Sequence, residues 1–422
     1  MKLLVAHNHY RQSGGEDEVF LRESELLRSA GHEVLEYKEH NREISEDGIP
    51  SKVQLAARTF WATDSIARLR SLLRREKPDL VHFHNTFPLI SPAAYYACHQ
   101  EGVPVVQSLH NSRLICPAAT LYRNGSACED CLGKTVPWPG VVHACYHNSR
   151  LQTAVVAGML AGHRVLGTWQ EQVDAYIVFT EFFRQKFIAA GLPRKKIFVK
   201  PHFLSTDPGM KQNIGDYALF LGRLAAEKGV RTLLQAFALL QNAIPLHIVG
   251  DGPLRAELEA QKSRACLSSV SFHGWLPRDQ TLKIMRGARF LIFPSEWSET
   301  FGLTIIEAFG SGLPVIASRL GSIAEVIEEG KTGFLVNPGS STGIAERIAR
   351  LAEDSQLRQK LGNQGRLKVT SHFSFERMIE NYSELYAGSG SISKKLTHYR
   401  VSASSDSLAN RGPLGRRSSR QR

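Results

Sequence analysis

The stretch Phe290-Leu-Ile-Phe-Pro-Ser-Glu-Trp-Ser-Glu-Thr-Phe-Gly-Leu-Thr-Ile-Ile-Glu307 decides the fold. Its first four residues are all apolar, and an apolar run this short predicts a buried parallel strand. Leu303–Phe309 has the composition of a helix start. A strand, a loop and a helix in this order form the repeating unit of a doubly wound α/β sheet.

Two carboxylates, Glu299 and Glu307, lie eight positions apart around this loop. Ligands of open α/β sheets collect at the carboxyl ends of the strands, where the N–H groups of Phe301, Gly302 and Leu303 would point at an anion. Carboxylates are strong acceptors for hydroxyl groups. The pattern predicts a ligand with hydroxyls and phosphate, such as a sugar nucleotide. Two glutamates at a helix start can alternatively serve only to complement the helix dipole.

Two cations follow another predicted strand, Tyr217–Leu221. Arg223 and Lys228 stand in the segment Gly222-Arg-Leu-Ala-Ala-Glu-Lys-Gly229 and therefore also leave the carboxyl end of a strand. Each alone is usually a solvated charge, but both form charge-assisted hydrogen bonds with phosphate. Together with the glutamates they indicate a binding site.

The remaining apolar runs alternate with helical stretches over most of the chain, which predicts two parallel, doubly wound sheets. Pro and Gly cluster near Pro201–Met210, where we place the join between an N-terminal domain, 1–205, and a C-terminal domain, 206–388. Glu16–Ala30 is expected to be a helix that closes on Gly31. The further predicted strands are Lys2–Ala6, Glu33–Tyr37, Leu80–Phe83, Val103–Leu109, Ala175–Phe179, Leu246–Val249, Val270–Phe272, Val315–Ala317 and Phe334–Val336.

The composition is that of a globular protein with a basic end. Of the formal charge of +12 over 422 residues, the segment after Gly388 carries +7, and this tail, 389–422, is expected to be disordered. It could touch nucleic acid or anionic lipid, or only aid solubility; nucleic acid is not expected as a partner. The chain has neither a signal-peptide pattern nor an apolar run of about 18 residues, so we expect it in the cytoplasm.

A second basic segment, Arg58–Lys77, contains Phe60 and Trp61. A basic amphipathic helix with aromatic residues suits the surface of an anionic membrane. The segment therefore predicts a peripheral contact of the protein with the inner face of the membrane. Alternatively, its apolar residues at helical spacing, Ile66, Leu69 and Leu73, form a core face beneath a charged exterior.

Four of the six cysteines are grouped in a segment rich in Gly, Pro and Asn, 113–147. Their spacing is C-x11-C-x2-C-x13-C, which predicts a structural zinc site with four thiolate ligands. Independent buried thiols are the alternative. Cys98 and Cys266 are expected in the core, and the four grouped residues are Cys116, Cys128, Cys131 and Cys145.

The chain resembles the retaining glycosyltransferases of family 4, which have the GT-B fold, from about Met1 to Ala387. Each matching motif alone is weak evidence for the family, but all of them in the same order over most of the chain are specific for it. The motifs are Ser13-Gly-Gly-Glu16, Ser108-Leu-His110, Gly222-Arg with Glu227-Lys-Gly229, Val249-Gly-Asp-Gly-Pro253, Phe272-His-Gly274, the Glu299-x7-Glu307 stretch, Gly312-Leu-Pro-Val315 and Lys331-Thr-Gly-Phe-Leu-Val-Asn-Pro338.

The resemblance implies two Rossmann-like domains that face each other across a cleft, with a final helix near Phe373–Tyr386 crossing back onto the first. It implies that His110 contacts the donor sugar, that Glu299 holds hydroxyls of that sugar and that Glu307 holds those of the ribose. Further donor-binding positions would be Gly14, Gly15, Gly274, Phe301, Gly302 and Leu303. His7, His9, His82 and His84 also fall near strand ends, where they could line the acceptor site.

The expected reaction is transfer of a sugar from a UDP or GDP donor to a hydroxyl of a saccharide or lipid-linked acceptor, with retained configuration. Arg223 and Lys228 would neutralise the departing diphosphate, so that no catalytic cofactor is needed. Cell-surface polysaccharide, lipopolysaccharide or glycolipid synthesis is the expected setting. The alternatives are another GT-B enzyme, such as a nucleotide-sugar epimerase, and a non-catalytic nucleotide-sugar-binding protein.

Overall fold

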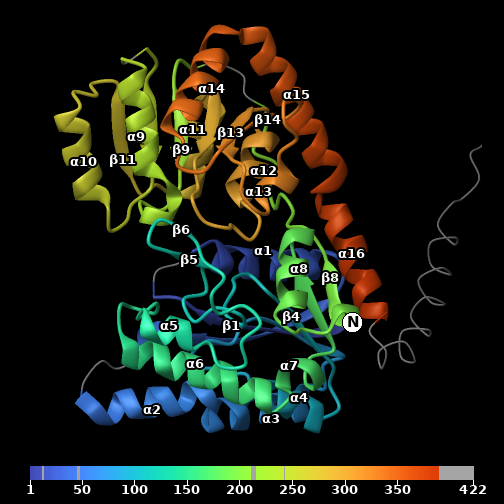
Figure 1. The fold of residues 1–422 in the computed structure, drawn as a ribbon. Coiled ribbons are helices and arrows are strands. Elements are labelled where there is room, and N and C mark those ends of the chain that lie inside the picture. The colour runs from blue at the N-terminus through green and yellow to red at the C-terminus, as the bar shows by residue number, and fades with distance from the viewer. Residues whose placement is uncertain (12–13, 45–47, 211–214, 242, 389–422) are drawn as a thin grey trace, which may run out of the picture.

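The structure, a computed structural model, describes residues 1–11, 14–44, 48–210, 215–241 and 243–388. It contains two six-stranded parallel sheets, each packed against helices and stacked one above the other in Figure 1. The expectation of two doubly wound α/β sheets is confirmed. The basic tail, 389–422, lies outside the described residues, as does Ser13 of the predicted glycine loop.

The first sheet has the strand order β2-β1-β3-β4-β7-β8, so its direction of winding reverses between β1 and β3. Its strands are β1 (Lys2–His9), β2 (Glu33–His40), β3 (Leu80–Asn85), β4 (Val105–Ser108), β7 (Ala175–Val178) and β8 (Ile197–Val199). The helices of this half are α1 (Gly15–Ser29), α2 (Gly48–Phe60), α3 (Thr63–Glu76), α4 (Ala94–Gln100), α5 (Trp138–Val142), α6 (Arg150–Val165), α7 (Thr168–Glu171) and α8 (Glu181–Ala189), with short 3-10 turns at Asn41–Glu43 and Arg194–Lys196.

The second sheet has the order β11-β10-β9-β12-β13-β14 and reverses between β9 and β12. Its strands are β9 (Ala218–Leu221), β10 (Leu246–Val249), β11 (Val270–Gly274), β12 (Phe290–Phe293), β13 (Val315–Ser318) and β14 (Gly333–Val336). Its helices are α9 (Val230–Leu239), α10 (Arg255–Arg264), α11 (Arg278–Gly287), α12 (Leu303–Gly310), α13 (Ile323–Val326), α14 (Ser341–Glu353), α15 (Ser355–His372) and α16 (Phe375–Gly388), and a 3-10 turn covers Ala226–Lys228.

The basic segment Arg58–Lys77 is not one helix, because α2 ends at Phe60 and α3 begins at Thr63. Leu69 and Leu73 are buried, as the core-face alternative requires. The arginines are paired with acids: Arg58 and Arg68 with Asp64, Arg68 also with Glu39, and Arg70 and Arg74 with Glu101. The charged exterior of this segment is thus largely neutralised by the protein itself. None of the helices in the described ranges is both long and apolar enough to cross a membrane.

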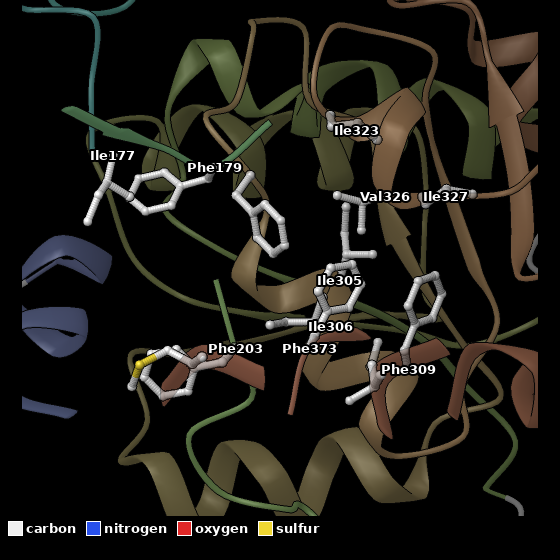
Figure 2. Packing of buried hydrophobic residues seen from close by; sticks show 14 of the residues in the cluster. Ile177, Phe179, Phe203, Ile305, Ile306, Phe309, Ile323, Val326, Ile327 and Phe373 are labelled. Carbon is white, nitrogen blue, oxygen red and sulfur yellow. The ribbon is translucent and has the colours of Figure 1, made fainter. Parts of the chain in front are cut away.

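The two halves share apolar contacts. Figure 2 shows Phe179 and Phe203 of the first half beside Ile305 and Phe373 of the second, all within one buried cluster. Helix α16 then returns along the first domain, as Figure 1 shows. Its Tyr382 Oη donates a hydrogen bond to Oε2 of Glu23 in α1 at 2.9 Å. The relative position of the sheets is therefore fixed by packing at the join and by the last helix.

Candidate active site

The reversal of strand order in the second sheet brings together two of the residues that the sequence singled out. Lys228 follows β9 and Glu299 follows β12, and ligand sites of open α/β sheets form at such a switch point. Nζ of Lys228 donates to Oε1 of Glu299 at 2.5 Å. Oγ of Ser295 donates to the same oxygen at 2.7 Å. Both charged side chains are mostly buried, so their positions are well defined by their partners.

Gly229 explains how the two loops approach each other. Its φ is +67°, and a Cβ atom there would lie 1.9 Å from the carbonyl oxygen of Pro294. Only glycine fits such a contact. The close approach lets Glu296 N donate to Glu227 O at 2.8 Å, and it places Lys228 Nζ 5.2 Å from the centre of the Trp297 ring. The glycine of the Glu-Lys-Gly sequence is thus required by the geometry of the site.

Helix α12 begins at Leu303, a few residues after Glu299 in the sequence. Gly302 precedes it with φ +93° and no side chain caps the helix, while Ile305 N donates to Gly302 O at 2.9 Å, so a ligand could be bound by the N–H groups before Ile305. Phe301 is 2% exposed and belongs to the buried core, so its ring does not face a ligand. Across the domain boundary, a Cβ atom on Gly15 would lie 3.7 Å from Cδ1 of Leu303. The predicted glycine loop of the first domain therefore meets the start of α12.

Glu307 lies one turn further into α12 and pairs with Arg278 at the start of α11. Nη1 of Arg278 is 2.7 Å from Oε1 of Glu307. Burial raises the pKa of Glu307, while the Arg278 guanidinium opposes the rise. Sequence reasoning missed Arg278, because nothing in its neighbourhood distinguishes it from the chain's other arginines.

Two predicted positions stand apart from the Lys228–Glu299 pair. Arg223 has an exposed side chain. Gly274 ends the edge strand β11, and a Cβ atom there would lie 2.9 Å from Nη1 of Arg255. Within the described chain, neither residue forms a hydrogen bond or ion pair with Lys228 or Glu299, so a ligand would have to bridge them.

His110, after strand β4, is held in a cluster of rings. Its Nε2 lies 2.9 Å from Nδ1 of His84, and its ring is 5.0 Å from that of Phe179 and 5.6 Å from that of His202. Burial, followed by the neighbouring His84 and His202, holds the pKa of His110 well below its ordinary value. At neutral pH its imidazole is therefore uncharged and able to donate or accept one hydrogen bond at each nitrogen.

Behind His110, a buried network leads to the last helix. Oε1 of Glu23 is 3.0 Å from Nδ1 of His82 and 3.3 Å from Nε2 of His84, and Tyr386 Oη lies 3.0 Å from the same His82 nitrogen. Burial raises the pKa of Glu23, but His84 and His82 outweigh it and keep that pKa well below its ordinary value. The network fixes the ring of His84 and, through it, that of His110.

The histidines expected to line the acceptor site are thus mostly enclosed. His7, His82 and His84 are at most 2% exposed, so their rings do not face solvent, and an acceptor-lining role for them stays a prediction. They instead satisfy buried carboxylates, His7 and His9 sharing Oδ1 of Asp17 at 2.9 and 3.0 Å. Two sets of residues in the described chain hold three possible metal ligands within 4.8 Å, namely His7, His9 and Asp17, and Glu23, His82 and His84.

Among the cysteines, Cys98 is buried as expected, but Cys266 is exposed and the prediction for it was wrong. It occupies the tight turn after α10, with φ +52°, and not the core. The four grouped cysteines line one small cavity.

Comparison with known proteins agrees with this architecture. Residues 13–207 match the model of Glycosyltransferase Family 4 and residues 211–368 that of Glycosyl transferases group 1. A relative from Bacillus anthracis, N-acetyl-alpha-D-glucosaminyl L-malate synthase, is 33% identical over 325 residues, which are 76% of this chain and 77% of the relative. The protein is a glycosyltransferase of the GT-B type and belongs to glycosyltransferase family 4.

Other relatives act on different molecules. The 2-deoxystreptamine glucosyltransferase of Streptomyces kanamyceticus is 28% identical over 70% of this chain and 73% of its own. The sulfoquinovosyl transferase SQD2 of Arabidopsis thaliana is 28% identical over 71% of this chain, which spans only 54% of that relative. Among solved structures, HepE of Anabaena in complex with UDP has a TM-score of 0.67 at 19% identity and covers 91% of this chain and 99% of its own. The last similarity shows the fold alone.

Proposed function

We propose that the protein transfers a sugar from a nucleoside diphosphate donor to an acceptor hydroxyl with retention of the anomeric configuration. The observation that carries this proposal is the pairing of Lys228 with Glu299 at the switch point of the second sheet, directly before α12. One cation, one carboxylate and a helix start supply partners for both phosphate and sugar hydroxyls. Structures of the similarly folded HepE contain UDP, and UDP with glucose, which supports this class of donor.

In the proposed reaction, the leaving diphosphate lies against the start of α12. Lys228, with Arg223 turning in from the surface, stabilises the negative charge that develops on the phosphate. These cations take the role that a divalent metal has in other transferases, so we expect added Mg²⁺ to leave the rate unchanged. The N–H groups of the Gly302 turn contribute in the same direction.

The carboxylates divide the rest of the donor between them. Glu299 accepts hydrogen bonds from the sugar and Glu307 from the ribose, while neutral His110 contacts the sugar from the first domain. No described side chain is assigned as a nucleophile, and the leaving phosphate takes the acceptor proton on the same face of the sugar. The acceptor is a saccharide or a lipid-linked saccharide, bound on the side of the first domain.

The test starts with purified protein and a panel of UDP- and GDP-sugars. The true donor should raise the melting temperature, because a ligand that binds only the folded state stabilises it. Transfer to a saccharide acceptor, followed by NMR of the product, should give the anomer of the donor. Release of nucleotide without any acceptor would favour a hydrolase, and conversion of the donor into another nucleotide sugar without release would favour an epimerase. Binding with neither change would favour a non-catalytic binding protein. An inverted product would disprove retention.

A further inference from the structure

Four cysteines from a span of thirty residues converge on one cavity. Its volume is about 10 Å³, and its lining contains all four sulfur-bearing residues together with Arg123 and apolar groups such as Pro117 and Leu121. A space of this size holds a single water-sized or ion-sized occupant. All four cysteines are free thiols. They are Cys116, Cys128, Cys131 and Cys145.

Four sulfur ligands around a cavity that holds a single ion favour zinc. A set of soft thiolates selects zinc or an iron–sulfur cluster, and a cluster of several iron and sulfide ions needs more room than one ion. Zinc with four cysteines is tetrahedral, with Zn–S distances of about 2.3 Å. The four sulfur atoms surround the cavity but lie further apart than the ligand atoms of the two histidine–carboxylate groups, which are within 4.8 Å of one another. A bound ion would draw them inward by side-chain rotation.

The backbone conformation around the cavity also indicates a cross-link. Of the ten non-glycine residues with positive φ in the described chain, six lie between positions 119 and 148. Such conformations are costly for residues with a Cβ atom, and they persist only where the surroundings enforce them. Regular structure in this segment is limited to α5 and the two-residue strands β5 (Tyr122–Arg123) and β6 (Ser126–Ala127). Cys116 and Leu121 belong to the buried core of the first domain, and Leu132 and Tyr146 pack against it, so a cross-link would add to this packing.

We propose that Cys116, Cys128, Cys131 and Cys145 bind one zinc ion as thiolates and that this ion holds the β5–β6 hairpin at the domain boundary. The thiols release their protons to solvent as the Zn–S bonds form. The surrounding contacts position the module: Lys186 pairs with Glu129, and Arg164 Nη1 donates to the carbonyl oxygens of Lys134 and Thr135.

The hairpin reaches the loops that carry the candidate active site. Figure 1 shows β5 and β6 between the two sheets. Burial raises the pKa of Tyr122, and the charges of Glu296 and Glu227 raise it further. Glu227 and Glu296 directly adjoin the loops of Lys228 and Glu299. By holding the hairpin, the metal fixes one side of the candidate active site, on the side of the acceptor. This role rests on the proposed function, whereas the proposal that the cysteines bind zinc does not.

Metal analysis of the full-length protein tests the inference directly. Purified wild-type protein should contain about one zinc per chain, and titration with an organic mercurial should release that zinc to a coloured chelator as about four thiols are blocked. C128S/C131S should lose the metal. The exposed thiol gives a matched control, since C266S should keep the full zinc content.

The outcomes separate the inference from its alternatives. Wild-type protein that holds no zinc even after incubation with Zn²⁺, or whose mercurial titration releases none, overturns the proposal without any variant. Iron with acid-labile sulfide would equally overturn it in favour of a cluster. If C128S/C131S folds, it should be cleaved faster by protease within residues 113–147 while binding UDP within about twofold of wild type, because UDP contacts are assigned to the second domain. Zinc present in a protein that fails to transfer any sugar would refute the proposed function alone.

Discussion

Nζ of Lys228 and Oε1 of Glu299 lie 2.5 Å apart, although 71 residues separate them in the sequence. We propose phosphate as the ligand of the first and sugar as the ligand of the second, and the structure adds that each orients the other. Removing one partner leaves the other as a mostly buried charge without compensation, which is more costly than removing both. The pair is therefore expected to act as a unit.

A double-mutant cycle tests this unit. Lys228→Ala should lower kcat/KM by about 10²-fold or more, because a preorganised charge at the leaving group is lost. Glu299→Gln should also lower it, and the double variant should lose less than the sum of the two, with a coupling of about 0.5–3 kcal/mol.

The control for this cycle is Lys331→Ala, which removes an exposed lysine that pairs with Glu328 on its own turn. Its kcat/KM should stay at the wild-type value. Strict additivity of the Lys228 and Glu299 effects would show that the pairing has no role in transfer, and wild-type rates in both single variants would remove the assigned site.

The two glutamates should differ in which ligand they affect. Glu307→Ala should weaken both the free nucleoside diphosphate and the intact donor, since a charged hydrogen bond to ribose is worth roughly 1.5–3 kcal/mol. Glu299→Ala should leave the affinity for the nucleoside diphosphate nearly unchanged while it cripples transfer. Calorimetry measures both affinities. If the glutamates only complement the dipole of α12, both variants would lose about 0.3–1 kcal/mol of stability and bind both ligands normally.

Much of this architecture could be predicted because the parallel strands are short apolar runs with polar loops between them. The exceptions are instructive. Strand β8, Ile197–Val199, has only three residues, and its Phe198 is 37% exposed, so its pattern is too short to detect. The cysteine spacing indicated a common site, but the hairpin at Tyr122–Ala127 depends on turn geometry that the spacing does not contain.

The candidate site was predictable only in part, for a similar reason. Lys228 and Glu299 adjoin strand ends, and parallel topology brings strand ends together. Glu23 lies in the middle of α1 within an ordinary amphipathic pattern, and its partner Tyr382 is 359 residues away. Neither position carries a local signal, because their pairing results from the return of α16 and not from any short-range pattern.

Stability should fall in mild acid because of a buried histidine beside the site. Burial is the largest cause that lowers the pKa of His202 to about 3. Between about pH 6.5, the ordinary histidine value, and that lowered pKa, the unfolded chain binds more protons than the folded one. The contribution of His202 to the free energy of unfolding is therefore fully present above pH 6.5. Below pH 6.5 it decreases by up to about 1.4 kcal/mol per pH unit.

His202→Phe should reduce this slope, because the ring stays among Phe179 and Phe301 without a group that takes up a proton. Urea unfolding between pH 6.5 and 4.5 measures it. His84, whose pKa is lowered to about 4, keeps part of the slope in the variant. An unchanged slope in His202→Phe would contradict the assignment.

The final prediction concerns the return of α16 onto the first domain. Tyr382 donates to a buried carboxylate, Glu23, and Tyr386 lies in hydrogen-bond contact with a buried imidazole, His82. Hydrogen bonds to charged groups contribute about 1.5–3 kcal/mol and neutral ones about 0.5–1.5 kcal/mol. Tyr382→Phe should therefore destabilise the protein more than Tyr386→Phe, as measured by urea unfolding. Glu384→Gln, on the exposed side of α16, should cost less than about 1 kcal/mol. Equal and small losses in both tyrosine variants would show that the hydroxyls do not anchor the helix and that apolar packing alone holds it.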